Sequence, residues 1–182
     1  MLQAAQLSFG YSEAEDRISL RVLAPEGRIL NILLTRRITR RLLAGLTDIL
    51  ARSSPILGRV STDDRIEVMV LEHLGALSTL KPPSTTEGVP TPSVSQPSPM
   101  AEMESVLATR VHVQTLSDRF VLQLEATDGP RAEARLSRSE FHRLLSALDQ
   151  YAERAEWNLK AEAGWLSQTD QVMRGRNAAE AS

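Results

Sequence analysis

The sequence predicts an α+β fold, on the basis of three observations. A stretch from Asp16 to Leu50 matches a second stretch from Asp118 to Ala152 without a gap and with about ten identical residues, which indicates an internal repeat. Each stretch begins with apolar and polar residues in alternation, as in half-buried strands. Apolar residues then recur every three or four positions, as in an amphipathic helix. We therefore predict two tandem β-β-β-α repeats, each with an antiparallel three-stranded sheet and one helix.

The first repeat is predicted to have strands at residues 6–11, 18–22 and 28–34. The turn at 24–27 contains Pro and Gly, which favour a hairpin between the second and third strands. Thr35 can cap the helix that follows. The apolar face of this helix comprises Ile38, Leu42, Leu46, Ile49 and Leu50.

The second repeat shows the same order of elements. Strands are predicted around residues 111–113, 120–124 and 130–136, with a hairpin turn at 127–129. Ser137 and Glu140 have the spacing of a capping box at the start of the helix. In both copies an Asp-Arg pair, at 16–17 and 118–119, precedes a strand. We interpret this pair as a strand-entry feature in which the Asp side chain bonds local backbone amides.

The two copies differ on the sheet face turned away from the helix. The first copy has Leu23, Ile29 and Leu33 there, whereas the second has Glu125, Arg131 and Arg135. A contiguous apolar patch seldom stays exposed, so the first sheet is expected to be covered. The candidate cover is a helix at 61–78, capped by Ser61, with an apolar stripe of Ile66, Val70, Leu74 and Leu77. The alternatives are a partner chain and the other copy.

The predicted domain organisation follows from these elements. Residues 1–79 form the first repeat with its additional helix, and 104–167 form the second. Residues 80–103 hold six of the nine prolines and are predicted to be a flexible linker, and 168–182 a frayed tail. Because a three-stranded sheet leaves open edges, the copies are expected to pair as a pseudo-dimer, within one chain or between two chains.

Composition limits the class of protein. The net charge is −2 and there is no cysteine, which excludes disulfides and thiolate metal sites. The start of the chain lacks the features of a signal peptide, and no apolar run approaches the roughly 18 residues that span a bilayer. We expect a soluble cytoplasmic protein without membrane contact.

No catalytic constellation is visible in the sequence. The three histidines, His73, His112 and His142, lie far apart and have no partner at ligand spacing. Phosphate-binding, zinc-protease and nucleophile-elbow motifs are absent. The sequence therefore predicts no enzyme, no metal site and no cofactor.

One charge cluster is a candidate site. Arg36, Arg37, Arg40 and Arg41 lie in the first turn and a half of the predicted first helix. Arginines beside free backbone amides can bind phosphate or acidic side chains. The alternative is a solvated face whose arginines pair with nearby Asp and Glu.

Duplicated sheet-plus-helix units that pair through their helices resemble in outline the PUR and Whirly nucleic-acid-binding repeats. Those repeats have four strands before the helix where three are predicted here, and none of their motifs is found in these residues. Their base stacking also requires aromatic platforms. Phe9, Phe120, Phe141 and Tyr151 are instead predicted to lie in the core, and the chain is assigned to no family.

The predicted function is that of a non-catalytic protein-binding or assembly module, a scaffold whose partner is another protein or a second copy. Leu23, Ile29 and Leu33 are its predicted interface, because they leave an apolar sheet face open. The alternative is binding of single-stranded DNA or RNA through the four arginines.

Overall fold

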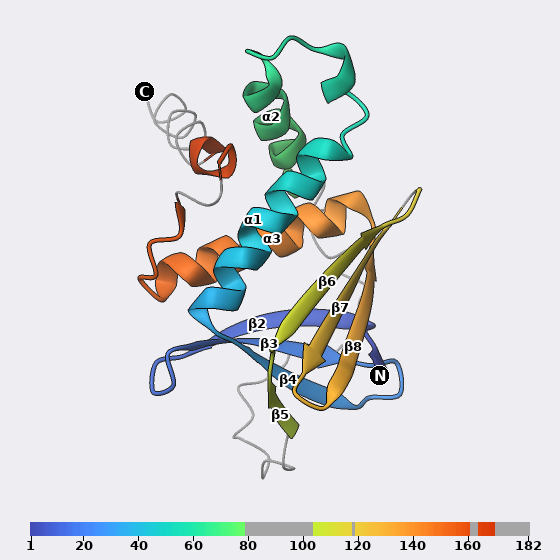
Figure 1. Cartoon of the computed structure of the whole chain (residues 1–182), viewed down its shortest axis with the longest axis vertical. Helices are drawn as coiled ribbons and strands as arrows, with labels where there is room; N and C mark the ends of the chain where they lie inside the picture. Colours follow the sequence, from blue (N-terminus) through green and yellow to red (C-terminus); the bar gives the residue numbers. More distant parts are fainter. Residues whose placement is uncertain (79–103, 118, 161–163, 170–182) are drawn as a thin grey trace, which may run out of the picture.

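The computed structural model describes residues 1–78, 104–117, 119–160 and 164–169 and confirms the α+β class (Figure 1). The strands are β1 (Leu2–Gln3), β2 (Gln6–Ser12), β3 (Arg17–Leu23), β4 (Ile29–Leu34), β5 (Glu104–Leu107), β6 (Arg110–Thr115), β7 (Phe120–Ala126) and β8 (Gly129–Leu136). The helices are α1 (Arg36–Arg52), α2 (Arg65–Ser78) and α3 (Arg138–Arg154), with a 3-10 turn, η1, at Leu57–Arg59.

Each of the two sheets has four strands and not the three that the sequence predicted. One sheet has the order β2-β3-β4-β5 and the other β1-β8-β7-β6. In each, three antiparallel strands come from one half of the chain and a short parallel strand comes from the other half. Leu2 pairs with Ala132, and Glu104 pairs with Leu30. Leu2 and Leu30 correspond to Glu104 and Ala132 under the offset of 102 residues that relates the two matched stretches of sequence. The two parallel pairings are therefore equivalent in the two halves.

The two sheets and the three helices share one hydrophobic core, to which α2 contributes Met69. Leu20 and Ile32 from the first half and Leu122 and Phe141 from the second are all fully buried within it. Phe141 stacks on Phe120 with ring centroids 4.2 Å apart. The helices α1 and α3 pack against each other, and they cross in the view of Figure 1. The two predicted repeats are thus packed as one body.

The two long helices begin where the sequence predicted. The Thr35 hydroxyl accepts a hydrogen bond from the Ile38 amide at 3.2 Å, so α1 starts at Arg36. Ser137 and Glu140 form a complete capping box at the start of α3. Hydrogen bonds from the side chain and the backbone amide of Ser137 lower the pKa of the Glu140 carboxyl.

Asp16 is not the local strand-entry residue that was predicted. Its carboxylate accepts hydrogen bonds from the Trp157 indole at 2.7 Å and from the Tyr11 hydroxyl at 2.9 Å. These two bonds lower the pKa of Asp16. Trp157 is buried and lies in the other half of the chain, so Asp16 connects the halves. Asp118 lies outside the described residues.

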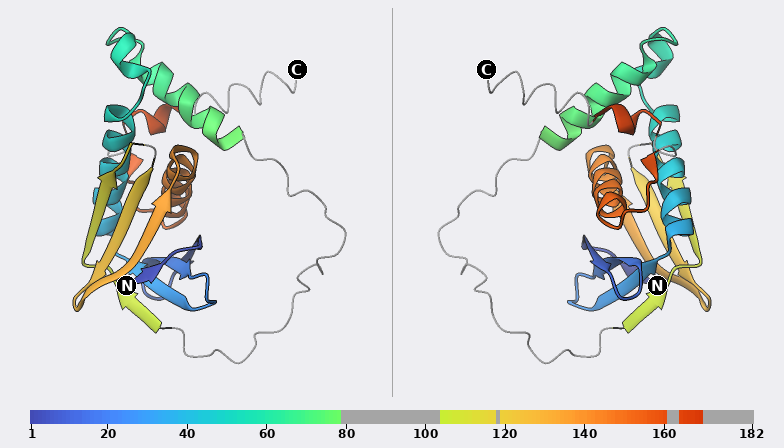
Figure 2. Two further views of the ribbon diagram at one scale, coloured as in Figure 1. Left: turned by 90° about the vertical axis from the view of Figure 1, so that its right-hand side faces the viewer. Right: turned by 90° about the vertical axis from the view of Figure 1, so that its left-hand side faces the viewer.

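The helix expected at 61–78 begins at Arg65, and it does not cover the first sheet. Its buried residues are Met69, Val70 and His73, whereas Ile66 is exposed. It packs against α3, and Figure 2 shows it at the end of the molecule away from β2–β5. The prediction that α2 covers Leu23, Ile29 and Leu33 is therefore wrong. Its apolar face packs against another helix. Periodicity identifies which face of a helix is apolar, but it does not specify the surface that this face contacts.

Several predicted segments fall wholly or partly outside the described residues. The predicted linker at 80–103 lies outside them, as do residues 170–182 of the predicted tail. Thr169, which was assigned to that tail, is buried. No helix in the described part of the chain is long and apolar enough to cross a bilayer.

Candidate functional site

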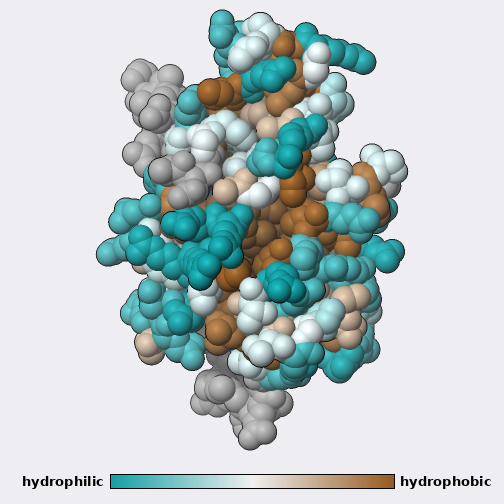
Figure 3. Space-filling view, in the orientation of Figure 1, coloured by the Kyte–Doolittle hydropathy of each residue, from teal (hydrophilic) through white to brown (hydrophobic). Residues whose placement is uncertain are grey.

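A groove lies between helix α1 and strand β6. Its volume is about 440 Å³. We refer to it as the α1–β6 groove, and its lining residues are Ile38, Arg41, Leu42, Gly45, Leu46, Ile49, Thr109, Arg110, Val111 and Val113. Figure 3 shows a hydrophobic area in the middle of this face, over α1 and β6, with hydrophilic residues beside it. An apolar hollow with a polar rim is typical of an interaction site.

Local structure explains why these side chains converge. The Thr35 cap fixes the start of α1, and helical periodicity then places Ile38, Leu42 and Ile49 on the same side of the helix. Along β6, Val111 and Val113 are half-buried, whereas Arg110, His112 and Gln114 are exposed. The valines of β6 therefore face the apolar stripe of α1.

Strand β6 also presents unpaired backbone groups. It is an edge strand of its sheet, since β7 is its only strand neighbour among the described residues. The Leu116 amide donates to the Arg119 carbonyl at 2.8 Å, so these two residues form a hydrogen-bonded pair. Such pairs alternate along an antiparallel ladder. The amide and carbonyl groups of Val111 and Val113 consequently point away from β7 and towards the open edge.

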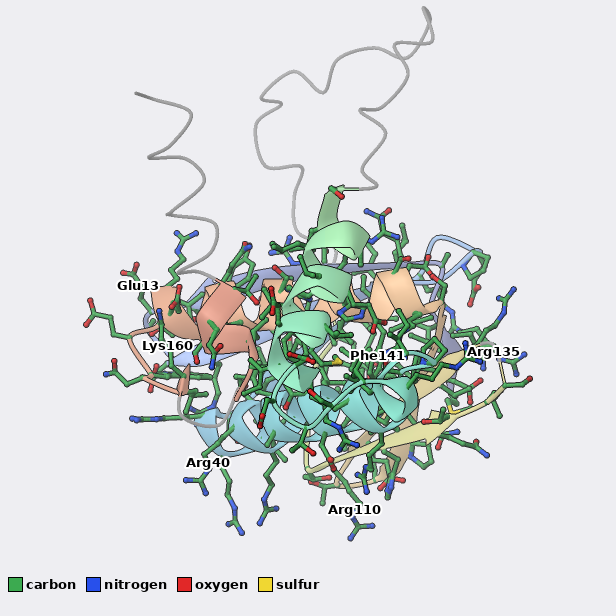
Figure 4. All side chains as sticks on the ribbon, turned by 90° about the horizontal axis from the view of Figure 1, so that it is seen from above. Glu13, Arg40, Arg110, Arg135, Phe141 and Lys160 are labelled. Atoms are coloured by element: carbon green, nitrogen blue, oxygen red, sulfur yellow. The ribbon has the colours of Figure 1, made fainter. Side chains whose placement is uncertain are left out.

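The rim of the groove is basic. Arg41 lies on the α1 side and Arg110 on the β6 side. The Arg110 side chain is 70% exposed and contacts the Glu125 carboxylate at 3.5 Å. Figure 4 shows Arg40 and Arg110 extending from the same side of the molecule. A ligand in the groove would meet positive charge on both sides.

The arginines predicted as a site lie beside this groove, and all four are exposed. Arg36, Arg37 and Arg41 form no ion pair with any residue in the described part of the chain, and the first turn of α1 contains no acidic residue. The charge of Arg36 nevertheless acts on the nearby Asp16 carboxyl, whose pKa it helps to lower. Of the four, Arg41 is the one that lines the groove.

The predicted interface residues lie on the outer face of the other sheet. Leu23 pairs with Ile29, and Leu33 pairs with Leu107 of β5. Ile29 and Leu107 are about half exposed, at 50% and 45%, whereas Leu23 and Leu33 are half-buried. Between the two apolar pairs, Asn31 donates a hydrogen bond to the Ser105 hydroxyl. This surface is apolar but is interrupted by a polar row, and the pocket that Ile29 lines is small, about 170 Å³.

Sequence reasoning missed a buried polar cluster that connects the three helices. The Nδ1 atoms of His73 and His142 are 3.0 Å apart, and both rings are almost fully buried. The other ring nitrogen of His142 lies 3.4 Å from the Glu72 carboxylate, which also forms an ion pair with Arg138. Arg138 in turn donates to the carbonyls of Leu50 and Ser53 at the end of α1.

This cluster explains how α2 is held in place. His73 and His142 are 69 residues apart, so no spacing rule could have found them as a pair. Trp165 packs edge-on against both rings and covers them. Burial excludes a substrate, and no group of three or more metal-ligating side chains occurs within the described residues. The third histidine, His112, is exposed on β6 and contacts Glu125.

The corresponding position in the other half holds a second groove, of about 380 Å³, between β2 and α3. There Phe9 of β2 stacks on Tyr151 of α3, with ring centroids 5.9 Å apart. The residues offset by 102 positions are the smaller Val111 and Ile49, which line the α1–β6 groove. Both grooves lie beside an edge strand, but Phe9 and Glu140 line the one in this half, whereas no aromatic or acidic residue of the described chain lines the α1–β6 groove. Comparison of the chain with models of known families, with curated proteins and with solved structures found no match.

Proposed function

We propose that this chain is a non-catalytic protein-binding module and that the α1–β6 groove is where it holds its partner. The observation that carries the proposal is the combination of an aliphatic floor, an open strand edge and a basic rim in one hollow. Apolar floors supply burial, and charged rims supply orientation and specificity. The outer face around Ile29 is a weaker candidate because it is interrupted by polar residues.

We further propose that the module arose from two copies of one sheet-and-helix unit, joined as a pseudo-dimer within the chain. The matched stretches and the two strand exchanges share the offset of 102 residues, which supports this origin. Exchange of a short strand between equivalent units is a low-cost route to a dimer. Divergence would then have given one groove an aliphatic lining and the other an aromatic and an acidic residue, Phe9 and Glu140.

Nucleic-acid binding is the second candidate function. Its support is the exposure of Arg36, Arg37 and Arg41 without ion-pair partners in the described residues. The groove itself argues against it, because none of the described residues that line it is aromatic. Single-stranded nucleic acids are usually held by stacking on aromatic side chains in addition to phosphate contacts.

Photocrosslinking from strand β6 tests the proposed function. A crosslinking amino acid at Gln114, which is exposed on β6, is expected to capture a discrete protein in cells. The same group at Gln150, exposed on α3, serves as the position control. Arg41→Glu is expected to lower the crosslinking yield about tenfold, because the attraction between Arg41 and an acidic group of the partner would become repulsion. Arg143→Glu, offset from it by 102 residues, is the charge control.

The outcomes of the photocrosslinking experiment distinguish the proposed function from its alternatives. Identical adducts from both positions, or adducts unaffected by Arg41→Glu, would contradict a partner site in the groove. Adducts that disappear after nuclease treatment would support nucleic-acid binding instead. Crosslinks to a second copy of the same chain would identify the partner as self and would keep the groove as the interface.

A further inference from the structure

We infer that strand β6 accepts an extended segment of another protein by strand addition, and that this segment alternates apolar and acidic side chains. The inference rests on the proposed function and deepens it by naming the class of partner and the way it is bound.

The backbone of β6 supplies the first step. Val111 and Val113 direct their amides and carbonyls to the open edge of the sheet, as the alternation from the Leu116–Arg119 pair requires. An exposed edge of this kind is a template for another strand. An added strand would pair with these groups about 4.8 Å from β6, on the side where the groove lies.

The side-chain pattern of the ligand follows from the two faces of this sheet. Residues of an added strand alternate between the faces. One set would enter the groove between Leu42 and Val113, where the aliphatic floor favours apolar side chains. The other set would lie on the strand face that carries the exposed Arg110 and His112, where Arg110 also reaches the rim of the groove.

Charge complementarity makes that second set acidic. Arg110 carries a permanent positive charge at the open edge, and its contact with the Glu125 carboxylate is a long one, at 3.5 Å, from a side chain that is 70% exposed. The rim residue Arg41 has no ion pair with the described residues. Opposite charges on neighbouring strands are stabilising and like charges are not. A basic ligand strand would be repelled from both sides.

The same reasoning disfavours a second copy of β6 as the ligand. The segment Arg110–Thr115 contains Arg and His but no acidic residue. Pairing of two β6 edges would therefore supply no acidic side chain from either strand to the arginines of the rim. A separate protein with an acidic and apolar segment fits the edge better.

Peptide selection on the purified full-length chain tests this inference. A random library of linear peptides about six residues long, the usual length of a strand, is displayed and selected for binding. The expected enrichment is for sequences that alternate aliphatic residues with Asp or Glu. Each enriched peptide is then synthesised with a fluorescent label, and its affinity is measured by anisotropy.

Backbone methylation of the ligand provides a control that needs no variant of the protein. A strand uses alternate amides for pairing on one edge only. N-methylation on the pairing edge is expected to weaken binding at least about fivefold for each lost bond, whereas methylation on the other edge leaves it nearly unchanged. Equal losses from both edges, or no loss from either, would overturn strand addition.

Two substitutions in the protein test the same contacts that the modified peptides test. Val113→Pro removes an amide that faces the open edge, and edge strands tolerate Pro at such positions. This substitution should weaken binding of the peptides at least about fivefold. Arg41→Glu should weaken acidic peptides and favour versions that carry Lys in place of Glu, whereas Arg143→Glu should do neither. Chemical unfolding confirms that each variant is folded.

The outcomes separate the inference from the proposed function. If photocrosslinking finds a partner in the groove but methylation has no edge preference, the protein-binding function stands and strand addition fails. If the library yields no peptide that depends on Arg41 or Val113, strand addition by an acidic segment fails as well. If labelled oligothymidine competes with the selected peptides, the groove also binds nucleic acid. That result would overturn the inference that its ligand is a segment of another protein.

Discussion

Fragments covering residues 1–78 and 104–182 are expected to be unfolded when each is alone and to fold when they are mixed. Each sheet takes one strand from the other half, and the two halves share one hydrophobic core. A lone fragment would lose the Phe9–Tyr151 stack and the Asp16–Trp157 hydrogen bond, and it would expose the buried faces of α1 and α3. A unit of this size is already marginal for an independent core.

Circular dichroism and size-exclusion chromatography of the fragments check this prediction. Each separate fragment should show no cooperative thermal transition. The equimolar mixture should show one, with a midpoint that rises with protein concentration because folding has become bimolecular. A full-length chain cleaved at a protease site placed within residues 79–103 serves as the control and should elute as one species. A cooperative transition in either isolated fragment would show that the units fold independently.

Replacement of Glu72 by Gln is expected to destabilise the protein by about 2–4 kcal/mol at neutral pH. Burial tends to raise the pKa of this carboxyl. Hydrogen bonds from His142 and Arg138, together with the charges of these two residues, outweigh burial and lower the pKa from 4.5 to about 2. The substitution leaves the Arg138 guanidinium and the buried His142 ring without their carboxylate.

The cost of this substitution should depend on pH in a defined direction. The folded-state pKa of Glu72 is depressed, so its contribution is fully present above about pH 4.5 and is lost as the pH falls towards 2. A depression of this size corresponds to about 3 kcal/mol. The difference in unfolding free energy between the native chain and Glu72→Gln should therefore shrink across this window.

Urea unfolding at a series of pH values measures that difference directly. Other carboxylates titrate in both proteins and cancel in the comparison. Glu67→Gln, at an exposed position of the same helix, is the matched control and should change stability by no more than about 0.5 kcal/mol. A Glu72→Gln cost that stays constant between pH 6 and pH 2.5 would contradict an ionised, hydrogen-bonded Glu72 in the folded state.

The sequence identified much of the local structure. Alternation located the longer strands, and the helical repeat located α1 and α3. Thr35 and Ser137 marked the helix starts, because a cap is a contact between residues three positions apart. The sequence also showed the arginine cluster at the start of α1, and three of these arginines form no ion pair within the described residues. These features are local, so a short window of sequence contains all the interacting groups.

The long-range features were decided by the tertiary structure alone. A strand as short as Leu2–Gln3 has no sequence signature, and its partner at Ala132 is chosen by which sheet edge lies open beside it. The His73–His142 pair and the Asp16–Trp157 bond join residues that are far apart in the chain. Likewise, the α1–β6 groove exists only because α1 lies beside a strand from the other half. Periodicity determined which faces are apolar, whereas the relative placement of the elements determined what each face and each edge meets.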